Sequence, residues 1–193
     1  MKKILLITLA TFTLLFTSCD VLQQASDAVQ FAQCDFSIDR VGMEKVGGVS
    51  IKDIHKPEDL NPLELIGLGQ QVMSGSLPVT LDVAIKAANN QSQKAGISGL
   101  DWELYMKDTR YGGGKLNRAV EVLPGQSTTF PVSVSFDLLK LVTGNNLQQI
   151  LDIVFNINDK EKLNQLDLKL QLKPYYRVGS EVQEYPGYIT VRP

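Results

Sequence analysis

Few residues in this chain have types and spacing that could do covalent or metal chemistry. His55 is the only histidine, so a Ser-His-Asp or Cys-His arrangement would have to use it. It lies in Ile54-His55-Lys56-Pro57, which has the character of a surface loop and contains no catalytic motif. Zinc sites need several Cys or His ligands, more than this chain supplies. We therefore predict a non-enzymatic protein with no catalytic residues, metal site or cofactor.

Two further segments have weak chemical signals. Cys34 is interpreted as a buried small hydrophobic residue rather than a nucleophile. The Gly112-Gly113-Gly114 triplet lacks the lysine and the strand-to-helix context of a phosphate-binding loop, so we predict a hairpin turn there.

The amino terminus has the pattern of a secretory signal. Met1-Lys2-Lys3 is basic, residues 4–16 are apolar apart from three threonines, and the small residues Thr17 and Ser18 precede Cys19. The apolar run is shorter than the roughly 20 residues that a membrane-spanning helix needs. We predict that residues 1–18 are a signal peptide. An ordinary signal peptide, with Cys19 there by coincidence, is the alternative.

The segment Leu15-Phe16-Thr17-Ser18-Cys19 resembles the lipobox of bacterial lipoproteins, although Phe16 replaces the usual leucine. The resemblance implies that Cys19 carries palmitate or similar acyl chains after the preceding peptide is removed. Several acyl chains anchor a protein firmly, whereas one binds only marginally. The implied partner is therefore a membrane, reached through lipid on Cys19, and the implied location is the bacterial cell envelope. With Cys19 acylated, Cys34 has no intrachain disulfide partner.

Composition and charge exclude some classes of partner. The chain has 193 residues, 44% of them hydrophobic and 21% charged, which is typical of a globular domain. Its 21 acidic residues outnumber its 19 basic ones, and removal of Lys2 and Lys3 would widen the difference. Nucleic acid is therefore not expected as a partner. We predict one domain over residues 34–193, preceded by a lipidated cysteine and helical tether over 19–33. Residues 20–33 would be either a spacer or a helix packed on the domain.

The hydrophobic pattern from residue 34 onward indicates a mainly β protein. Apolar and polar residues alternate over residues 79–86, 100–107, 128–136 and 166–173, which is the period of half-buried strands. Helices are predicted from Asp59 or Asn61 onward and over 137–142 and 146–155, and turns at 89–94, 123–126 and 179–184. Strands with one apolar face bury it against a second sheet, which predicts an antiparallel β-sandwich of about seven strands with inserted short helices. A barrel is the alternative.

The order of motifs from Leu81 to Leu138 resembles the late-embryogenesis-abundant (LEA) type 2 family, also called the water-stress and hypersensitive-response domain. An Asn-rich turn at residues 89–91, Gly99-Leu100-Asp101-Trp102, and Leu123-Pro124-Gly125-Gln126 occur in that order. Members carry Asn-Pro-Asn in the first turn, where only Asn89 matches. The resemblance implies an immunoglobulin-like sandwich, non-enzymatic and linked to desiccation or stress, and it supplies no catalytic residues.

Two surfaces are candidates for binding. Four tyrosines near the carboxyl end could form an aromatic surface for a glycan or protein, or could pair across a terminal hairpin: Tyr175, Tyr176, Tyr185 and Tyr188. Residues 63–72 would either line an apolar pocket or pack into the core. We predict a membrane-anchored binding or structural module. The alternatives are a carrier or chaperone of an apolar ligand such as lipid, an envelope hydrolase using His55, and a stress-protection role.

Overall fold

The computed structural model describes residues 22–106, 108–140, 150–151, 154–155, 167–178 and 180–192. The protein is mainly β, with 52% of the described residues in strands and with antiparallel sheets that curl toward a half-barrel, so the predicted sandwich-like fold is confirmed. Eleven strands are described, against about seven predicted. The difference comes from short segments, because five of these strands have four residues or fewer.

The first sheet has the strand order β2-β1-β3-β8 and every pairing in it is antiparallel. β8 is the terminal strand of this sheet, a position that tolerates Pro131, a residue without a backbone donor. The inward residues of β3 and β8 are the alternating apolar ones, and Val79 pairs with Phe136 as Ile85 does with Phe130. The strands are β1 (Asp35–Val46), β2 (Val49–Ser50), β3 (Pro78–Ala88) and β8 (Ser127–Asp137).

The second sheet has the order β10-β9-β5-β6, and a further short strand, β11, also pairs with β9. β9 runs through Pro174, as predicted. The turn predicted over 179–184 is wrong in part, since Glu181 pairs with Val178 to begin a hairpin. The strands are β5 (Gly99–Met106), β6 (Thr109–Leu116), β9 (Leu168–Val178), β10 (Glu181–Glu184) and β11 (Ile189–Val191); β4 (Ala95–Ile97) pairs separately with β7 (Val120–Val122).

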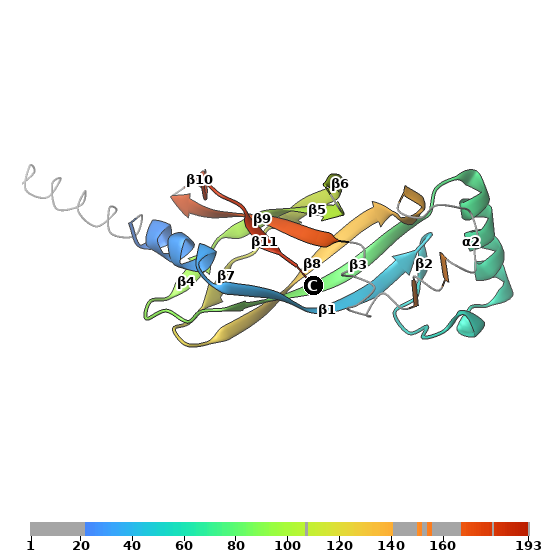
Figure 1. Ribbon diagram of the computed structural model, residues 1–193, viewed down its shortest axis with the longest axis horizontal. Helices are drawn as coiled ribbons and strands as arrows, with labels where there is room; N and C mark the ends of the chain where they lie inside the picture. Colours follow the sequence, from blue (N-terminus) through green and yellow to red (C-terminus); the bar gives the residue numbers. More distant parts are fainter. Residues whose placement is uncertain are drawn as a thin grey trace, which may run out of the picture.

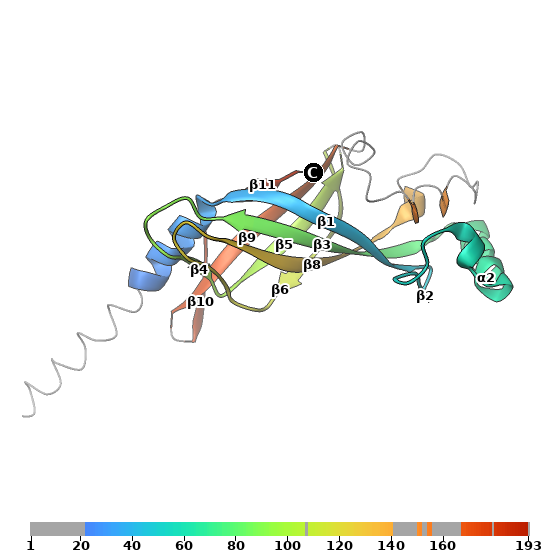
Figure 2. The same ribbon diagram turned by 90° about the horizontal axis from the view of Figure 1, so that it is seen from below.

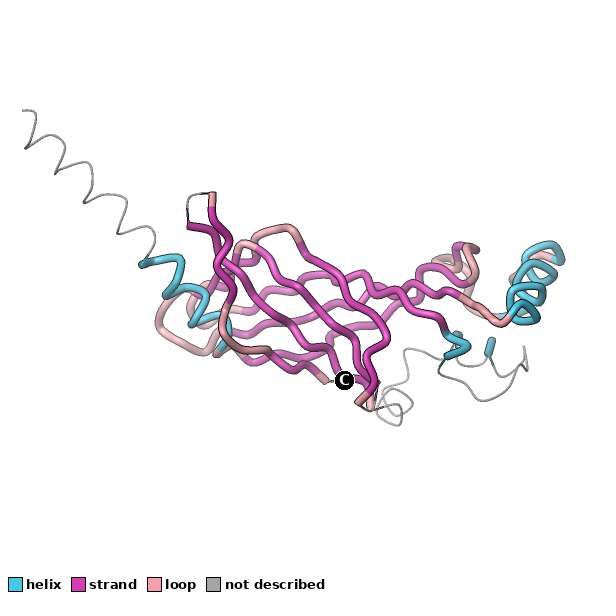
Figure 3. The backbone as a smooth tube through the Cα atoms, turned by 90° about the horizontal axis from the view of Figure 1, so that it is seen from above, coloured by secondary structure: helices cyan, strands magenta, loops and turns pink. Residues whose placement is uncertain are grey.

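The core lies between the two sheets, which Figures 1 and 3 show lying over one another. Leu104 and Leu172 of the second sheet are fully buried, as are Val134 and Phe130 of the first. Burying a side chain of this size contributes about 1.5–3 kcal/mol. The sandwich is therefore held by apolar packing, and its one described free cysteine, Cys34, is buried within it.

The predicted helix after Asn61 is confirmed as α2 (Pro62–Ser74). Asn61 Oδ1 accepts a hydrogen bond from the Glu64 amide at 2.9 Å, and the Glu64 carboxylate accepts one from the Asn61 amide at 2.9 Å. These two bonds form a capping box. The helix buries Leu68 and Val72. Leu63 and Ile66, which were expected to face the core, are instead 80% and 58% exposed.

The helical segment over residues 22–32 lies at the opposite end of the molecule from α2 (Figures 1 and 2). Its Ala28 and Phe31 are fully buried, and the Phe31 ring lies 5.3 Å from that of Phe36 in β1. This packing corresponds to the second of the two interpretations of residues 20–33.

Parts of the later helical predictions fall outside the described residues. Of the helix predicted over 137–142, the structure describes a 3₁₀ turn at Leu138–Lys140. Of the helix predicted over 146–155, residues 150–151 and 154–155 are helical, with Ile150 and Val154 buried.

The Gly112-Gly113-Gly114 triplet is not the predicted hairpin turn, because it lies within β6. A Cβ at Gly114 would be 2.5 Å from Cζ2 of Trp102, and one at Gly112 would be 2.8 Å from the Ser135 carbonyl oxygen. Glycine is required here for close approach of a ring and of a second backbone, not for a turn. The triplet thus lets Trp102 pack flat and lets β6 lie beside β8.

Candidate functional site

Cys19, the predicted lipidation site, lies outside the described residues, which begin at Leu22. Leu22 is already helical, and three residues of chain span at most about 11 Å, so Cys19 lies within that distance of the helix. The described part of this helix, residues 22–32, is tied to the sandwich. Within the described residues, no helix has both the length and the apolar character needed to cross a bilayer.

A buried ion pair fixes that helix to the loop between β3 and β4. Asp27 is only 6% exposed. Its carboxylate accepts from Lys94 Nζ at 2.9 Å and from Gln23 Nε2 at 2.7 Å. The hydrogen bond to Asp27 raises the pKa of Lys94, so Lys94 keeps its positive charge at neutral pH. The sequence analysis did not identify this contact, because Asp27 and Lys94 are far apart in the chain and neither belongs to a motif.

The ion pair borders a cavity of about 550 Å³ at the same end of the molecule. Residues from the helix, β7 and β9 line it, among them Asp27, Glu121 and Arg177. Lys94 also lies 3.6 Å from Glu121. The cavity therefore carries charges of both signs.

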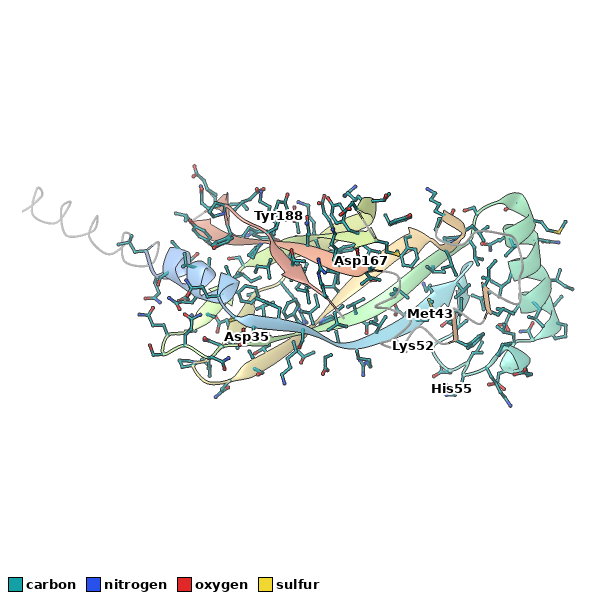
Figure 4. The ribbon with its side chains drawn as sticks, in the orientation of Figure 1. Asp35, Met43, Lys52, His55, Asp167 and Tyr188 are labelled. Carbon is teal, nitrogen blue, oxygen red and sulfur yellow. The ribbon has the colours of Figure 1, made fainter. Side chains whose placement is uncertain are left out.

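The four tyrosines of the predicted aromatic surface lie in different environments. Tyr175 and Tyr176 are neighbours in β9, and neighbouring residues of a strand point to opposite faces. Tyr175 is buried, and its hydroxyl donates to Asn117 Oδ1 at 2.9 Å. Tyr176 packs against the core. Tyr185 is half-buried, while Tyr188 is 53% exposed (Figure 4). Tyr188 is therefore the member available to a partner.

Tyr188 belongs to a row of paired charges and rings on the outer face of the second sheet. Lys173 Nζ lies 5.0 Å from the centre of the Tyr188 ring, within the range of a cation–π interaction, and 3.0 Å from the Glu184 carboxylate. The hydrogen bond to Glu184 raises the pKa of Lys173. The positive charge of Lys173 on this part of the face is therefore neutralised by the Glu184 carboxylate.

The same arrangement recurs one pairing further along the sheet. Tyr105 and Lys169 are direct cross-strand partners, with Lys169 Nζ 5.8 Å from the ring centre. The Tyr105 hydroxyl donates to Glu103 at 3.0 Å, which raises the pKa of Tyr105. Arg110 Nε lies 2.9 Å from the same carboxylate. Alternation in the sequence placed Tyr105 and Lys169 on the water-facing side, but only the register brings them together.

The side chains of His55 and Cys34 lie far apart. Cys34 precedes Asp35 at the start of β1, whereas His55 lies beyond the far end of that strand (Figure 4). A 12-residue strand is roughly 40 Å long. His55 is exposed and lines a cavity of about 420 Å³ with the Lys52–Glu44 ion pair.

The environment of Cys34 opposes nucleophilic chemistry. Its side chain is buried, and its sulfur contacts the Gln30 carbonyl oxygen at 3.6 Å. Burial, and then the negative charge of Asp35, raise the pKa of the thiol to about 11. Thiolate, the reactive form, is scarce at neutral pH under these conditions. Among the side chains that the structure describes, no group of three or more His, Cys, Asp or Glu could hold a metal ion.

Asn89, the one residue of the Asn-rich turn that matches the LEA type 2 pattern, is fully buried. Its Nδ2 donates to the carbonyl oxygens of Gln93 at 2.8 Å and Val122 at 3.0 Å, and its Oδ1 accepts from the Gln91 amide at 3.1 Å. The side chain thus holds the β3–β4 loop to β7, which is a structural role.

No family model matches the chain, and no curated protein matches it. Solved structures with some similarity include a protein from Archaeoglobus fulgidus, at 16% identity over 58% of this chain and 80% of that one, with a TM-score of 0.32. The putative ApaA protein from Bordetella pertussis has 9% identity over 82% and 88%, with a TM-score of 0.33. A FixG-related protein from Vibrio parahaemolyticus has 16% identity over 80% and 97%, with a TM-score of 0.22. At these identities and TM-scores the similarity carries no argument about function.

Proposed function

We propose that this protein is a non-enzymatic binding or structural module of the bacterial cell envelope, held at a membrane by lipid on Cys19. The observation that carries the proposal is the run of a basic start, an apolar segment and Leu15-Phe16-Thr17-Ser18-Cys19 at the amino terminus. The packing of helix 22–32 on the sandwich through Ala28 and Phe31 supports it, since this places a fixed part of the domain close to Cys19 in the chain.

The arrangement of potentially reactive groups supports a role other than catalysis. A nucleophile and its base must lie within hydrogen-bond reach. Cys34 and His55 lie at opposite ends of β1, and the Cys34 thiol has a pKa of about 11. Exposed Tyr188, beside Lys173 and Glu184, is the group best suited to contact a glycan or protein partner.

The carrier hypothesis has less support. Between the sheets, the described core side chains such as Leu104, Phe130 and Leu172 are 0–1% exposed and belong to one packed cluster. Close packing of this kind does not favour an acyl-chain site among these side chains.

The finer assignment to an LEA type 2-like module with a stress role is part of the proposal. It is supported by the order of the β3 strand, the turn at Asn89, and the β5 and β8 strands. Comparing survival of drying in cells with and without the gene tests the stress role. Equal survival would remove it.

The anchor is tested by metabolic labelling with palmitate and by mass spectrometry of the purified mature protein. We expect label on the natural protein, with Cys19 as the first residue, and none on a Cys19→Ser variant. Cys34→Ser is the matched control and should label like the natural protein. Equal labelling of the natural protein and Cys19→Ser would overturn the proposal.

A further inference from the structure

The exposed large apolar side chains of the described residues gather mainly at two ends of the molecule. At the α2 end these are Leu63, Ile66 and Met73. At the other end, helix 22–32, the turn after β7 and strand β10 contribute Leu22, Leu123 and Val182, which are 69%, 49% and 50% exposed. Figures 1 and 2 both place these three elements at the end of the molecule opposite α2.

Hydrogen bonds and strand pairing also connect these elements. The turn containing Leu123 is bonded to Asn89, since the Gly125 amide donates to the Asn89 carbonyl oxygen at 2.8 Å. The following loop reaches the helix, where Gln91 Nε2 donates to the Gln30 carbonyl oxygen at 3.4 Å. Val182 pairs with Arg177, which lines the cavity beside Asp27. Three separate parts of the chain therefore display an apolar side chain around one end face.

The docked helix restricts how this end can sit relative to an anchor on Cys19. Cys19 lies within about 11 Å of Leu22 along the chain. The Asp27–Lys94 ion pair and the buried Phe31 hold the helix against the sandwich. A helix fixed in this way cannot rotate independently of the sandwich. The position of the anchor therefore determines which face of the domain meets the membrane.

We propose that the end face formed by helix 22–32, the 123–126 turn and β10 rests on the phospholipid bilayer, with Leu22, Leu123 and Val182 inserted at the headgroup boundary. This inference rests on the proposed anchor at Cys19. The cavity at this end carries Lys94 and Arg177 together with Asp27 and Glu121, and this mixture of charges complements a zwitterionic headgroup that pairs a phosphate with an ammonium. This orientation holds α2 away from the bilayer. The exposed Leu63, Ile66 and Met73 of α2 then face away from the membrane.

The test uses single cysteines labelled with the environment-sensitive dye NBD in the full mature protein. Leu123→Cys and Val182→Cys report on the proposed contact face, and Met73→Cys, which is on α2 and 87% exposed, is the matched control. The buried Cys34, whose thiol pKa is about 11, contributes little background, and the protein without an added cysteine measures it. Mass spectrometry first establishes lipid on Cys19. The protein is then placed in phosphatidylethanolamine–phosphatidylcholine vesicles and quenched with aqueous iodide.

We expect NBD at positions 123 and 182 to shift to the blue and to be quenched several-fold less by iodide in vesicles than in the unlipidated Cys19→Ser background. NBD at position 73 should be quenched equally in both. If Cys19 is acylated but positions 123 and 182 stay as accessible as position 73, the inference is overturned and the anchor stands. Protection of NBD from iodide at position 73 instead would also overturn the inference. So would protection at positions 123 and 182 that depends on protein concentration and needs no vesicles, because this would indicate contact with a second copy of the chain. Absence of lipid on Cys19 would overturn the anchor and this inference together.

Discussion

Lys94 Nζ lies 2.9 Å from Asp27 Oδ2, and this contact joins the amino-terminal helix to the loop between β3 and β4. The side chain of Asp27 is 9% exposed and that of Lys94 is 38% exposed. The interaction is thus buried on the carboxylate side and partly screened by water on the ammonium side.

Replacing Lys94 by methionine should destabilise the fold, because it leaves the buried Asp27 carboxylate without its cation. Loss of a buried pair costs several kcal/mol, but the exposure of Lys94 reduces the expected loss to about 1–2 kcal/mol. Urea unfolding followed by circular dichroism measures it. Lys52→Met, which removes an exposed ion pair with Glu44 at 3.4 Å, is the control and should change stability by less than about 0.5 kcal/mol.

The contribution of the Asp27–Lys94 pair should disappear at high pH. The hydrogen bond to Asp27 raises the pKa of Lys94 above its ordinary value of 10.5 in the folded protein. Stability from such a group is fully present below the unfolded pKa and is lost as pH rises through the folded pKa. The difference in unfolding free energy between the natural protein and Lys94→Met should be constant from pH 8 to 10 and shrink above 10.5. A difference that grows with pH would contradict the pairing.

Replacing Asn89 by alanine should cost about 2–4 kcal/mol. The change removes a buried hydrogen bond to the Val122 carbonyl oxygen and a part-buried one to that of Gln93, and a buried group left unsatisfied costs about 1–3 kcal/mol. Thermal and urea unfolding check the value. The neighbouring Asn90 is exposed, so Asn90→Ala should stay within about 0.5 kcal/mol. Equal effects of the two changes would mean that Asn89 does not hold this loop.

Replacing Gly99 by alanine should destabilise the second sheet by about 2–3 kcal/mol. A Cβ there would overlap the Tyr175 hydroxyl and lie 2.5 Å from the Leu116 carbonyl oxygen. Gly67 of α2 is the matched control, because nothing lies within 4 Å of a Cβ at that position. Gly67→Ala should stabilise the protein by about 0.5–1 kcal/mol through helix propensity. Denaturant midpoints of the two variants should therefore move in opposite directions.

The Cys34 thiol should react slowly with iodoacetamide while the protein is folded. Burial and the charge of Asp35 raise its pKa from 9.0 to about 11, which lowers the thiolate population near pH 8 about 100-fold. Burial reduces access further, so we expect alkylation at least about 100-fold slower than for the same thiol in urea. The Cys19→Ser variant isolates this thiol for mass spectrometry. Rapid modification of the folded protein would show that the site opens or that the thiol is activated.

Much of the fold could be predicted because local patterns report local structure. Period-two alternation located β3, β5, β8 and β9. Asn61, one of the two predicted starts of α2, is the residue that caps the helix, and capping depends only on residues within one turn. The 123–126 turn was identified by Pro124 and Gly125, the latter at a φ of +68°. The separation of Tyr175 from Tyr176 on opposite faces also follows from period two, once both are assigned to one strand.

The sequence by itself determined the class of the fold, the long strands, the cap of α2 and the signal-like amino terminus, because each depends on residue types close together in the chain. The tertiary structure alone decided that Gly112–Gly114 form a strand under Trp102, that Tyr105 pairs with Lys169, and that Asp27 meets Lys94. Each of these depends on strand register or close approach between distant segments. Register is set by the packing of whole sheets, so no window of neighbouring residues contains it.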